Sequence, residues 1–209
     1  MADPEPTVYL VDDDPDVLKS IGRLLDAAGF RIRAFPSPQS FLESFDPAAP
    51  GCVVLDLAMP GISGLELQSV LDSQGSALPI VFLTGRGDIA TSVHAMKRGA
   101  ADFLTKPVED DQLIAAVRDA LARDKVARSV QAERDRVAET LAALTVRERE
   151  VLERIVAGRL NKQIAAELGT VEKTIKFHRA NLMRKLGVRT LADLVKLAER
   201  AGVSRPPAS

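Results

Sequence analysis

Short apolar runs alternate with amphipathic stretches through roughly the first 120 residues, and this alternation constrains the fold more than any other feature. Three of the runs are almost continuously apolar, as in parallel strands that are covered on both faces. Gly29, Gly75 and Gly99 stand where the intervening helices should end. The five runs occupy residues 8–11, 31–35, 52–55, 80–83 and 102–104. Five strand–helix units predict an α/β domain with a doubly wound, five-stranded parallel sheet.

The remainder of the chain has a helical pattern throughout. We predict an α/β domain over 1–122, a helical linker over 123–143 and a small all-α domain of four helices over 144–209. The expected four helices occupy 147–157, 161–168, 171–186 and 191–201. A glycine directly follows each of them. The linker pattern fits a solvated helix, and a coiled-coil dimer stays open as the alternative because its heptads are irregular.

The net charge of −1 hides a strong asymmetry between the two halves. Residues 1–125 contain 11 Lys and Arg against 19 Asp and Glu, a balance of −8, whereas residues 126–209 contain 17 against 10, a balance of +7. An acidic half joined to a basic half indicates two tasks, and the basic half is the one suited to a polyanion such as DNA.

The only cysteine, Cys52, excludes an intramolecular disulfide and argues against a cysteine-based metal site. It opens an apolar run, so we expect a buried side chain. No secretion signal is evident and no apolar stretch is long enough to cross a bilayer, so we expect a cytoplasmic protein without membrane contact.

Polar groups follow the apolar runs, at the strand ends where open α/β sheets bind ligands. Three aspartates follow the first run, Asp56 the third and Thr84 the fourth, and Lys106 lies just past the fifth. Clustered carboxylates repel each other unless they are protonated or bridged by a cation, and Mg²⁺ is suited to the task. A lysine and a hydroxyl at the same edge suit a phosphoryl group. Alternatively, residues 12–14 could cap the helix that begins at Pro15, but that reading leaves Asp56 and Lys106 unexplained.

These strand-end motifs closely resemble the receiver domain of bacterial response regulators, over residues 7–121. They are Val-Asp-Asp at 11–13, Asp-Leu-Ala-Met-Pro-Gly at 56–61, Leu-Thr-Gly at 83–85 and Lys-Pro at 106–107. The resemblance implies a flavodoxin-like strand order 2-1-3-4-5 and a cis Lys106–Pro107 bond. It also implies that a sensor histidine kinase phosphorylates Asp56.

The same resemblance assigns further roles. Mg²⁺ would bind Asp13, Asp56 and the backbone carbonyl of Ala58, with Asp12 helping through water, and Lys106 would pair with the phosphoryl oxygens. Thr84 would turn toward the phosphoryl group, and Phe103, which matches the family's switch aromatic, would fill the space that Thr84 vacates. Phe103 lacks the hydroxyl of the commoner tyrosine.

The basic half resembles the LuxR/FixJ-type (NarL-type) helix-turn-helix. The matching segments are 144–152, 161–165, 174–179, 183–189 and 191–195. An apolar stripe including Ile175 and Leu182 marks the core face of the predicted recognition helix, and His178 near it is expected to be packed. Phe177 stands opposite among basic residues, where it could contact a thymine methyl group. Val171 replaces the usual Ser or Thr cap, which leaves Thr170 as a candidate cap one residue earlier.

We therefore expect one DNA-facing surface in this half. Lys176 and Phe177 match base-reading positions of the family. Lys162, Thr174 and Arg184 are expected at phosphates, and Lys173 and Arg179 flank the same face. The last helix could form a dimer contact or only close the bundle; both stay open.

Together the two resemblances predict a transcription regulator that is gated by phosphorylation, and activation is the commoner behaviour of the family. The implied partners are a sensor histidine kinase, double-stranded promoter DNA, RNA polymerase and, on phosphorylation, a second copy of the chain. We expect no enzyme activity beyond the receiver's own phosphorylation and dephosphorylation. Two rivals remain: a phosphohydrolase with an aspartate nucleophile, and a constitutive DNA-binding protein whose receiver only dimerises.

Overall fold

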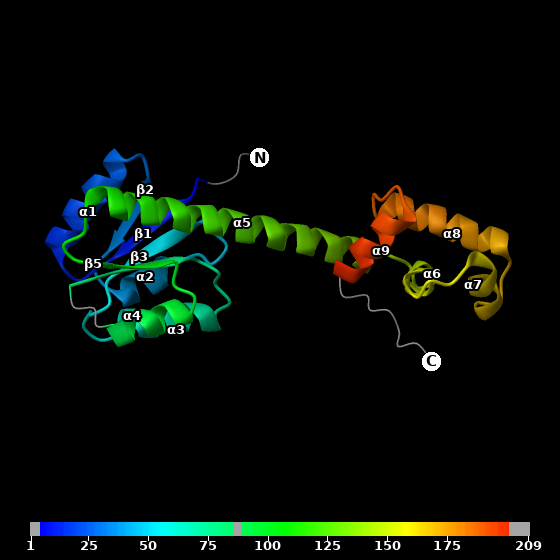
Figure 1. Cartoon of the computed structure of the whole chain (residues 1–209), viewed down its shortest axis with the longest axis horizontal. Helices are drawn as coiled ribbons and strands as arrows, with labels where there is room; N and C mark the ends of the chain where they lie inside the picture. Colours follow the sequence, from blue (N-terminus) through cyan, green and yellow to red (C-terminus); the bar gives the residue numbers. More distant parts are fainter. Residues whose placement is uncertain (1–4, 86–88, 201–209) are drawn as a thin grey trace. The chain divides into compact units, whose positions relative to one another are not determined.

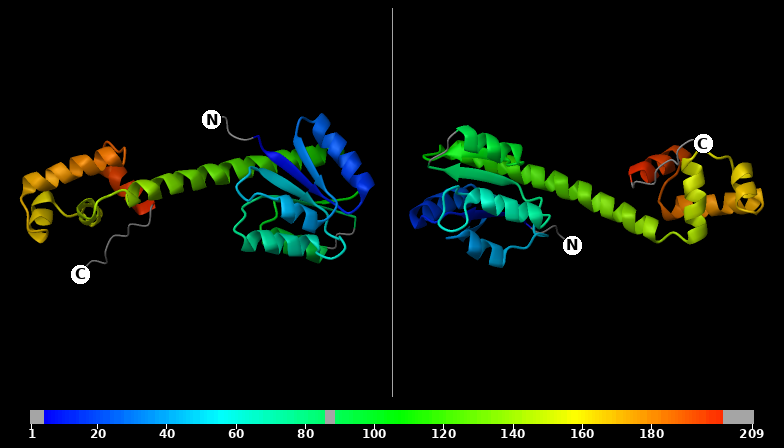
Figure 2. Two further views of the ribbon diagram at one scale, coloured as in Figure 1. Left: turned by 180° about the vertical axis from the view of Figure 1, so that it is seen from behind. Right: turned by 90° about the horizontal axis from the view of Figure 1, so that it is seen from below.

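The structure is a computed structural model that describes residues 5–85 and 89–200. The chain divides into two compact units after Arg128, and each is described by itself (Figures 1 and 2). The boundary falls inside the long helix α5 (Asp110–Ala142), so the contacts of the first unit extend six residues beyond the expected end at 122.

The first unit contains a parallel sheet of five strands in the order β2-β1-β3-β4-β5, which confirms the expected doubly wound fold and its order. The strands are β1 (Thr7–Val11), β2 (Arg31–Phe35), β3 (Gly51–Leu55), β4 (Ile80–Thr84) and β5 (Asp102–Thr105). β1, β3 and β4 are buried along their whole length, as continuous apolar runs require when both faces of a sheet are covered.

Helices cover both faces of this sheet (Figure 1). Together with α5, α1 (Pro15–Ala27) packs on one face, where Leu25 and Val117 meet Val8 and Leu10 in one apolar core. The other face carries α2 (Pro38–Ser44), α3 (Gly64–Ser73) and α4 (Ile89–Lys97) over a second core. Alternate residues of each strand feed the two cores because successive side chains of a strand point to opposite faces.

The stretch predicted as a helical linker, 123–143, is helical as far as Ala142, since α5 continues without a break for 33 residues. Val126 and Val130 are 64% and 48% exposed, so this stretch is solvated in the single chain, and coiled-coil pairing stays a prediction. No helix among residues 5–85 and 89–200 is long and apolar enough to cross a membrane.

The second unit is all-α, as expected. Besides the end of α5 it contains α6 (Val146–Val156), α7 (Asn161–Glu167), α8 (Glu172–Lys185) and α9 (Leu191–Arg200) around one apolar core. Leu194 and Ala198 of α9 are fully buried in this core, so α9 closes the bundle. Its expected role in dimer contact is a separate prediction.

The candidate cap of α8 was wrong. The N-cap is Val171, which supplies no side-chain hydrogen bond, and Thr170 lies outside the helix. The backbone N–H of Thr170 donates to the carbonyl of Ala165 at 2.9 Å, so this residue belongs to the turn that closes the C-terminal end of α7.

Candidate functional site

The carboxyl ends of β1 and β3 bring two predicted site residues together beside a third from the β5–α5 connection. Asp56 follows β3 and is tied to β1, because its N–H donates to the carbonyl of Val11 at 2.9 Å. Asp12 follows β1 directly, and both carboxylates are buried, with 2% of Asp12 and 7% of Asp56 exposed. Lys106 reaches them from the cis Lys106–Pro107 segment. The expected convergence and the expected cis bond are confirmed.

Lys106 bridges the two carboxylates. Its Nζ donates to Oδ1 of Asp56 at 2.8 Å and also to Oδ2 of Asp12. Burial works to lower the pKa of Lys106, but the hydrogen bonds and charges of the two aspartates outweigh it and raise that pKa. Burial raises the pKa of Asp12, and the hydrogen bonds from Lys106 and the Asp14 N–H only partly oppose it. The ammonium therefore stays charged and balances two buried acids.

The backbone amides next to the cluster orient the carboxylates. Oδ2 of Asp56 accepts from the N–H of Ala58 at 2.7 Å, and Oδ1 of Asp12 accepts from the N–H of Asp14 at 2.9 Å. Asp14 itself caps α1, because its Oδ1 accepts from the N–H of Asp16 at 2.9 Å. The capping alternative thus holds for Asp14, whereas Asp12 belongs to the cluster.

The expected Mg²⁺ site is only partly assembled by protein groups. Asp13 is exposed, and the described ranges contain no group of three or more His, Cys, Asp and Glu side chains placed to hold a metal ion. Asp12 and Asp56 nevertheless offer adjacent carboxylate oxygens at the sheet edge. This donor chemistry fits Mg²⁺, which commonly binds through one or two carboxylates and keeps several waters.

The two proposed switch residues lie on neighbouring strands. Thr84 at the end of β4 is fully buried, and its carbonyl accepts from the N–H of Lys106 at 2.7 Å. Phe103 of β5 is half-buried, with its ring centroid 6.1 Å from that of Phe82. The Phe103 ring thus packs against the core on the side of Phe82 and is partly exposed to solvent, which suits a side chain that changes its packing.

The predicted DNA-facing residues lie on α7 and α8. Phe177 is 62% exposed, although a plain solvated helix seldom presents so large an apolar side chain. Lys162, Lys173, Lys176 and Arg184 are also exposed. Lys176 forms an ion pair with Glu172 at 3.1 Å, one turn away.

Two members of this predicted set are partly withdrawn from the surface. Thr174 and Arg179 are half-buried, and Arg179 donates to Oδ1 of Asn161 at 2.6 Å, which joins α8 to α7. His178 is half-buried beside Phe177, so it is less completely packed than expected.

Sequence reasoning missed an ion pair between the exposed Lys185 and the buried Glu148, which holds α8 against α6. Only 4% of Glu148 is exposed; its Oε2 accepts from Nζ of Lys185 at 2.7 Å and from the N–H of Thr145 at 2.9 Å. These hydrogen bonds hold the pKa of Glu148 below its usual range. The Thr-x-x-Glu capping pattern at 145–148 was the available sequence signal for half of this contact.

The Glu148 contact predicts how the second unit responds to acid. A carboxyl whose folded pKa is depressed stabilises the fold above its unfolded pKa of about 4.5, and the contribution is lost as the pH falls through the folded value. We expect Glu148→Gln to cost about 1–2 kcal/mol at pH 7 and to weaken the loss of stability below pH 5. Residue-resolved urea unfolding by NMR measures both, with the exposed Glu153→Gln as control. Equal acid sensitivity in both variants would contradict the assignment.

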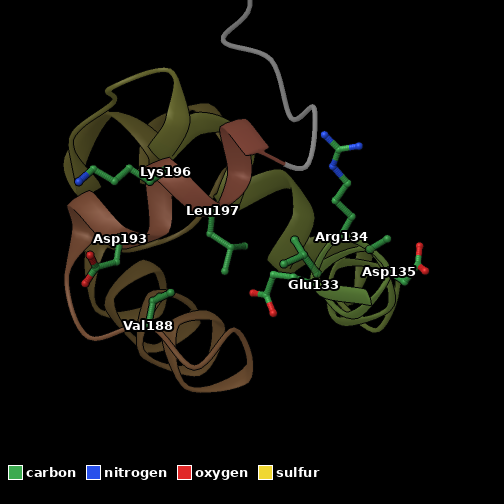
Figure 3. A pocket seen from close by; sticks show the side chains of 9 residues that line it. Glu133, Arg134, Asp135, Val188, Asp193, Lys196 and Leu197 are labelled. Carbon is green, nitrogen blue, oxygen red and sulfur yellow. The ribbon is translucent and has the colours of Figure 1, made fainter. Parts of the chain in front are cut away.

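A separate pocket of about 580 Å³ lies within the second unit (Figure 3). It is lined by residues from the end of α5 and from the segment that contains α9: Glu133, Arg134, Asp135, Val137, Ala138, Val188, Asp193, Lys196 and Leu197. Its lining contains none of the residues predicted to bind phosphate, metal or DNA.

An acid cluster with a lysine at the edge of a 2-1-3-4-5 sheet, joined to a basic helical bundle, defines the response-regulator class. Family profiles agree: "Response regulator receiver domain" matches residues 8–118, and "Bacterial regulatory proteins, luxR family" matches residues 142–198. The chain belongs to the two-component response regulators that join a receiver to a LuxR-type DNA-binding domain and regulate transcription.

Relatives of the same organisation match over nearly the whole chain. The transcriptional regulatory protein FixJ of Bradyrhizobium diazoefficiens is 42% identical over 94% of this chain and 96% of its own. The response regulator TodT of Pseudomonas putida is 40% identical over 96% and 88%. The solved structure of the response regulator StyR is 45% identical with a TM-score of 0.87, covering 94% of this chain and 99% of that one.

Proposed function

We propose that a sensor histidine kinase phosphorylates Asp56, and that this phosphorylation switches dimerisation and sequence-specific DNA binding. The observation that carries the proposal is the hydrogen bonding of the Asp56 carboxylate. One oxygen accepts from Nζ of Lys106 and the other accepts from the Ala58 N–H. We infer that the regulator activates transcription through contact with RNA polymerase. We place the phospho-acceptor domain at 1–122, the linker at 123–143 and the DNA-binding domain at 144–209, acting in the cytoplasm where promoter DNA lies.

The proposed reaction uses Asp56 as the nucleophile. A carboxylate oxygen forms the new P–O bond as the bond between phosphorus and the donor's leaving group breaks, and hydrolysis by water later reverses the modification. Lys106 remains beside Asp56 and offsets the charge of the incoming phosphoryl group. Asp12, Asp13, Asp56 and the Ala58 carbonyl would hold Mg²⁺, which when bound neutralises phosphoryl oxygens.

The proposed switch passes from the cluster to the outer strands. A phosphoryl group brings acceptor oxygens to the end of β3, and the Thr84 hydroxyl turns to donate to one of them. Phe103, whose ring centroid lies 6.1 Å from that of Phe82, then rotates inward to fill the space that Thr84 vacates, which changes the face made by α4, β5 and α5. This repacked face is the proposed site of receiver dimerisation.

Acetyl phosphate with Mg²⁺ tests the proposed function in the wild-type chain. We expect the mass in solution to double and DNA affinity to rise, measured by sedimentation and by binding to a fragment selected from random sequence. A constitutive regulator would bind DNA equally well without the donor. Turnover of exogenous phosphoesters, with no change in mass or affinity, would instead identify a phosphohydrolase.

Substitutions on the predicted DNA-facing surface should separate base recognition from phosphate contact. Lys176→Ala and Phe177→Ala should each relax sequence preference at the bases they contact, by about 1–3 kcal/mol of discrimination. Lys162→Ala should weaken all sequences alike and reduce the salt slope by about one unit, because it removes one phosphate contact. Selection from random DNA and salt titration measure the two effects. An unchanged preferred sequence in both α8 variants would remove this face from the proposal.

A further inference from the structure

A second charged cluster joins α5 to the opposite end of the strand that carries Asp56. Asp124 of α5 is only 2% exposed, although no part of the proposed phosphorylation chemistry uses it. Its Oδ2 accepts from the N–H of Gly51, the first residue of β3, at 3.0 Å. A buried aspartate is costly unless it is paired and hydrogen-bonded, so this contact requires a counter-charge.

Arg128, one helical turn later, supplies that charge. Its Nε lies 2.9 Å from both oxygens of Asp124, and its other nitrogens donate to the carbonyls of Ala48 and Ala49. The guanidinium therefore joins α5 to the loop before β3 through backbone atoms as well as through Asp124. Three nitrogens of one planar guanidinium hold one carboxylate and two carbonyls, which fixes its orientation more firmly than a flexible lysine would.

The backbone segment that Asp124 and Arg128 contact, at the start of β3, is closely packed. A Cβ on Gly51 would lie 2.0 Å from the carbonyl oxygen of Thr7, and the Thr7 N–H donates to the carbonyl of Pro50 at 3.0 Å. The start of β3 is thus enclosed between β1 and α5. Motion of α5 at Asp124 must be shared with the start of this strand.

We propose that Asp124 and Arg128 are positioning residues that anchor the linker helix to the receiver and make phosphorylation-dependent control of DNA binding depend on this anchor. The inference rests on the proposed function. Past the receiver's own core, α5 is highly charged and exposed, and an isolated stretch of such helix is only marginally stable. The Asp124–Arg128 anchor extends the ordered receiver to Arg128, where the first compact unit ends. Without this anchor, α5 would fray beyond the receiver core, and the repacking at β5 and α5 would no longer change DNA binding.

The test compares two full-length variants, Arg128→Gln and Lys125→Gln. Lys125 is an exposed residue on the same helical turn and carries the same charge as Arg128, so its variant is the control. Amide hydrogen exchange over residues 122–131 reports the anchor. The ratio of DNA affinities with and without acetyl phosphate, on a fragment selected from random sequence, reports the control. We expect Arg128→Gln to raise exchange at least tenfold and to lower the ratio at least fivefold, with Asp56 phosphorylated to the same extent as in the wild type. Lys125→Gln should change neither.

Arg128→Lys separates the anchor from general loss of folding, because it keeps the charge and loses the bonds to Ala48 and Ala49. An intermediate effect on both readouts supports the proposal. Faster exchange with an unchanged affinity ratio would overturn it, because the pair would then be structural only, and so would unchanged exchange in Arg128→Gln. If the wild type ignores acetyl phosphate, the proposed function fails and the claim of control fails with it, while the exchange data still decide whether the anchor exists.

Discussion

A chain carrying Asp56→Asn is expected to bind DNA with the same affinity in the presence and absence of acetyl phosphate. For the wild type we expect acetyl phosphate to raise the DNA affinity by about 5- to 150-fold, the range that corresponds to common coupling free energies. An amide is a poor nucleophile and cannot form the acyl phosphate, so the charge that drives the switch never arrives. Fluorescence anisotropy with labelled DNA, at constant salt, measures the two affinities.

The asparagine variant also perturbs the cluster in a defined way. Asp56 accepts at both oxygens, whereas the Asn amide nitrogen would face either Lys106 or the Ala58 N–H as a second donor. A modest loss of receiver stability is therefore expected, and a melting curve must accompany the affinities. Asp26→Asn, an exposed carboxylate at the end of α1, is the matched control and should keep the full response. A response that survives in Asp56→Asn would place the phospho-acceptor elsewhere.

Local pattern predicted the parts of the site that depend on sheet geometry. Apolar runs identify the strands, and parallel strands share one carboxyl edge, so Asp12, Asp56 and Lys106 had to meet there. The exact ligand set was less predictable. Asp13 follows Asp12 directly, yet consecutive residues at a strand end point in different directions, and Asp13 is exposed while Asp12 is buried.

The contacts that the sequence did not reveal pair residues far apart along the chain. Asp124 and Arg128 resemble any i,i+4 ion pair on a solvated helix, and only the fold places Gly51 and Ala48 beside them. Glu148 and Lys185 are equally ordinary until α6 and α8 pack together. Charge pattern alone cannot show which carboxylate of an ion pair is buried, because burial depends on the packing of distant segments.

Lys106→Met is expected to lower the free energy of unfolding of the receiver by about 2–4 kcal/mol without Mg²⁺. The ammonium balances two carboxylates that are 2% and 7% exposed, and methionine fills similar volume without the charge. Tyr9 is the only tyrosine of a chain without tryptophan, and it lies in the receiver core, so its fluorescence follows this unit alone in urea. Lys19→Met, exposed on α1, is the control and should change stability little.

Two ligands, Mg²⁺ and the proton, should compensate for the missing ammonium of Lys106→Met. Mg²⁺ binds the folded cluster better than the unfolded chain, so it should stabilise Lys106→Met more than the wild type. A proton should act in the same direction. Burial already raises the pKa of Asp12, and an acid with a raised folded pKa favours folding as the pH falls and opposes it as the pH rises through that value. The deficit of Lys106→Met should therefore be largest near pH 7 and shrink toward pH 5. A deficit that neither Mg²⁺ nor acid reduces would mean that Lys106 stabilises the receiver by packing, because charge balance would respond to both.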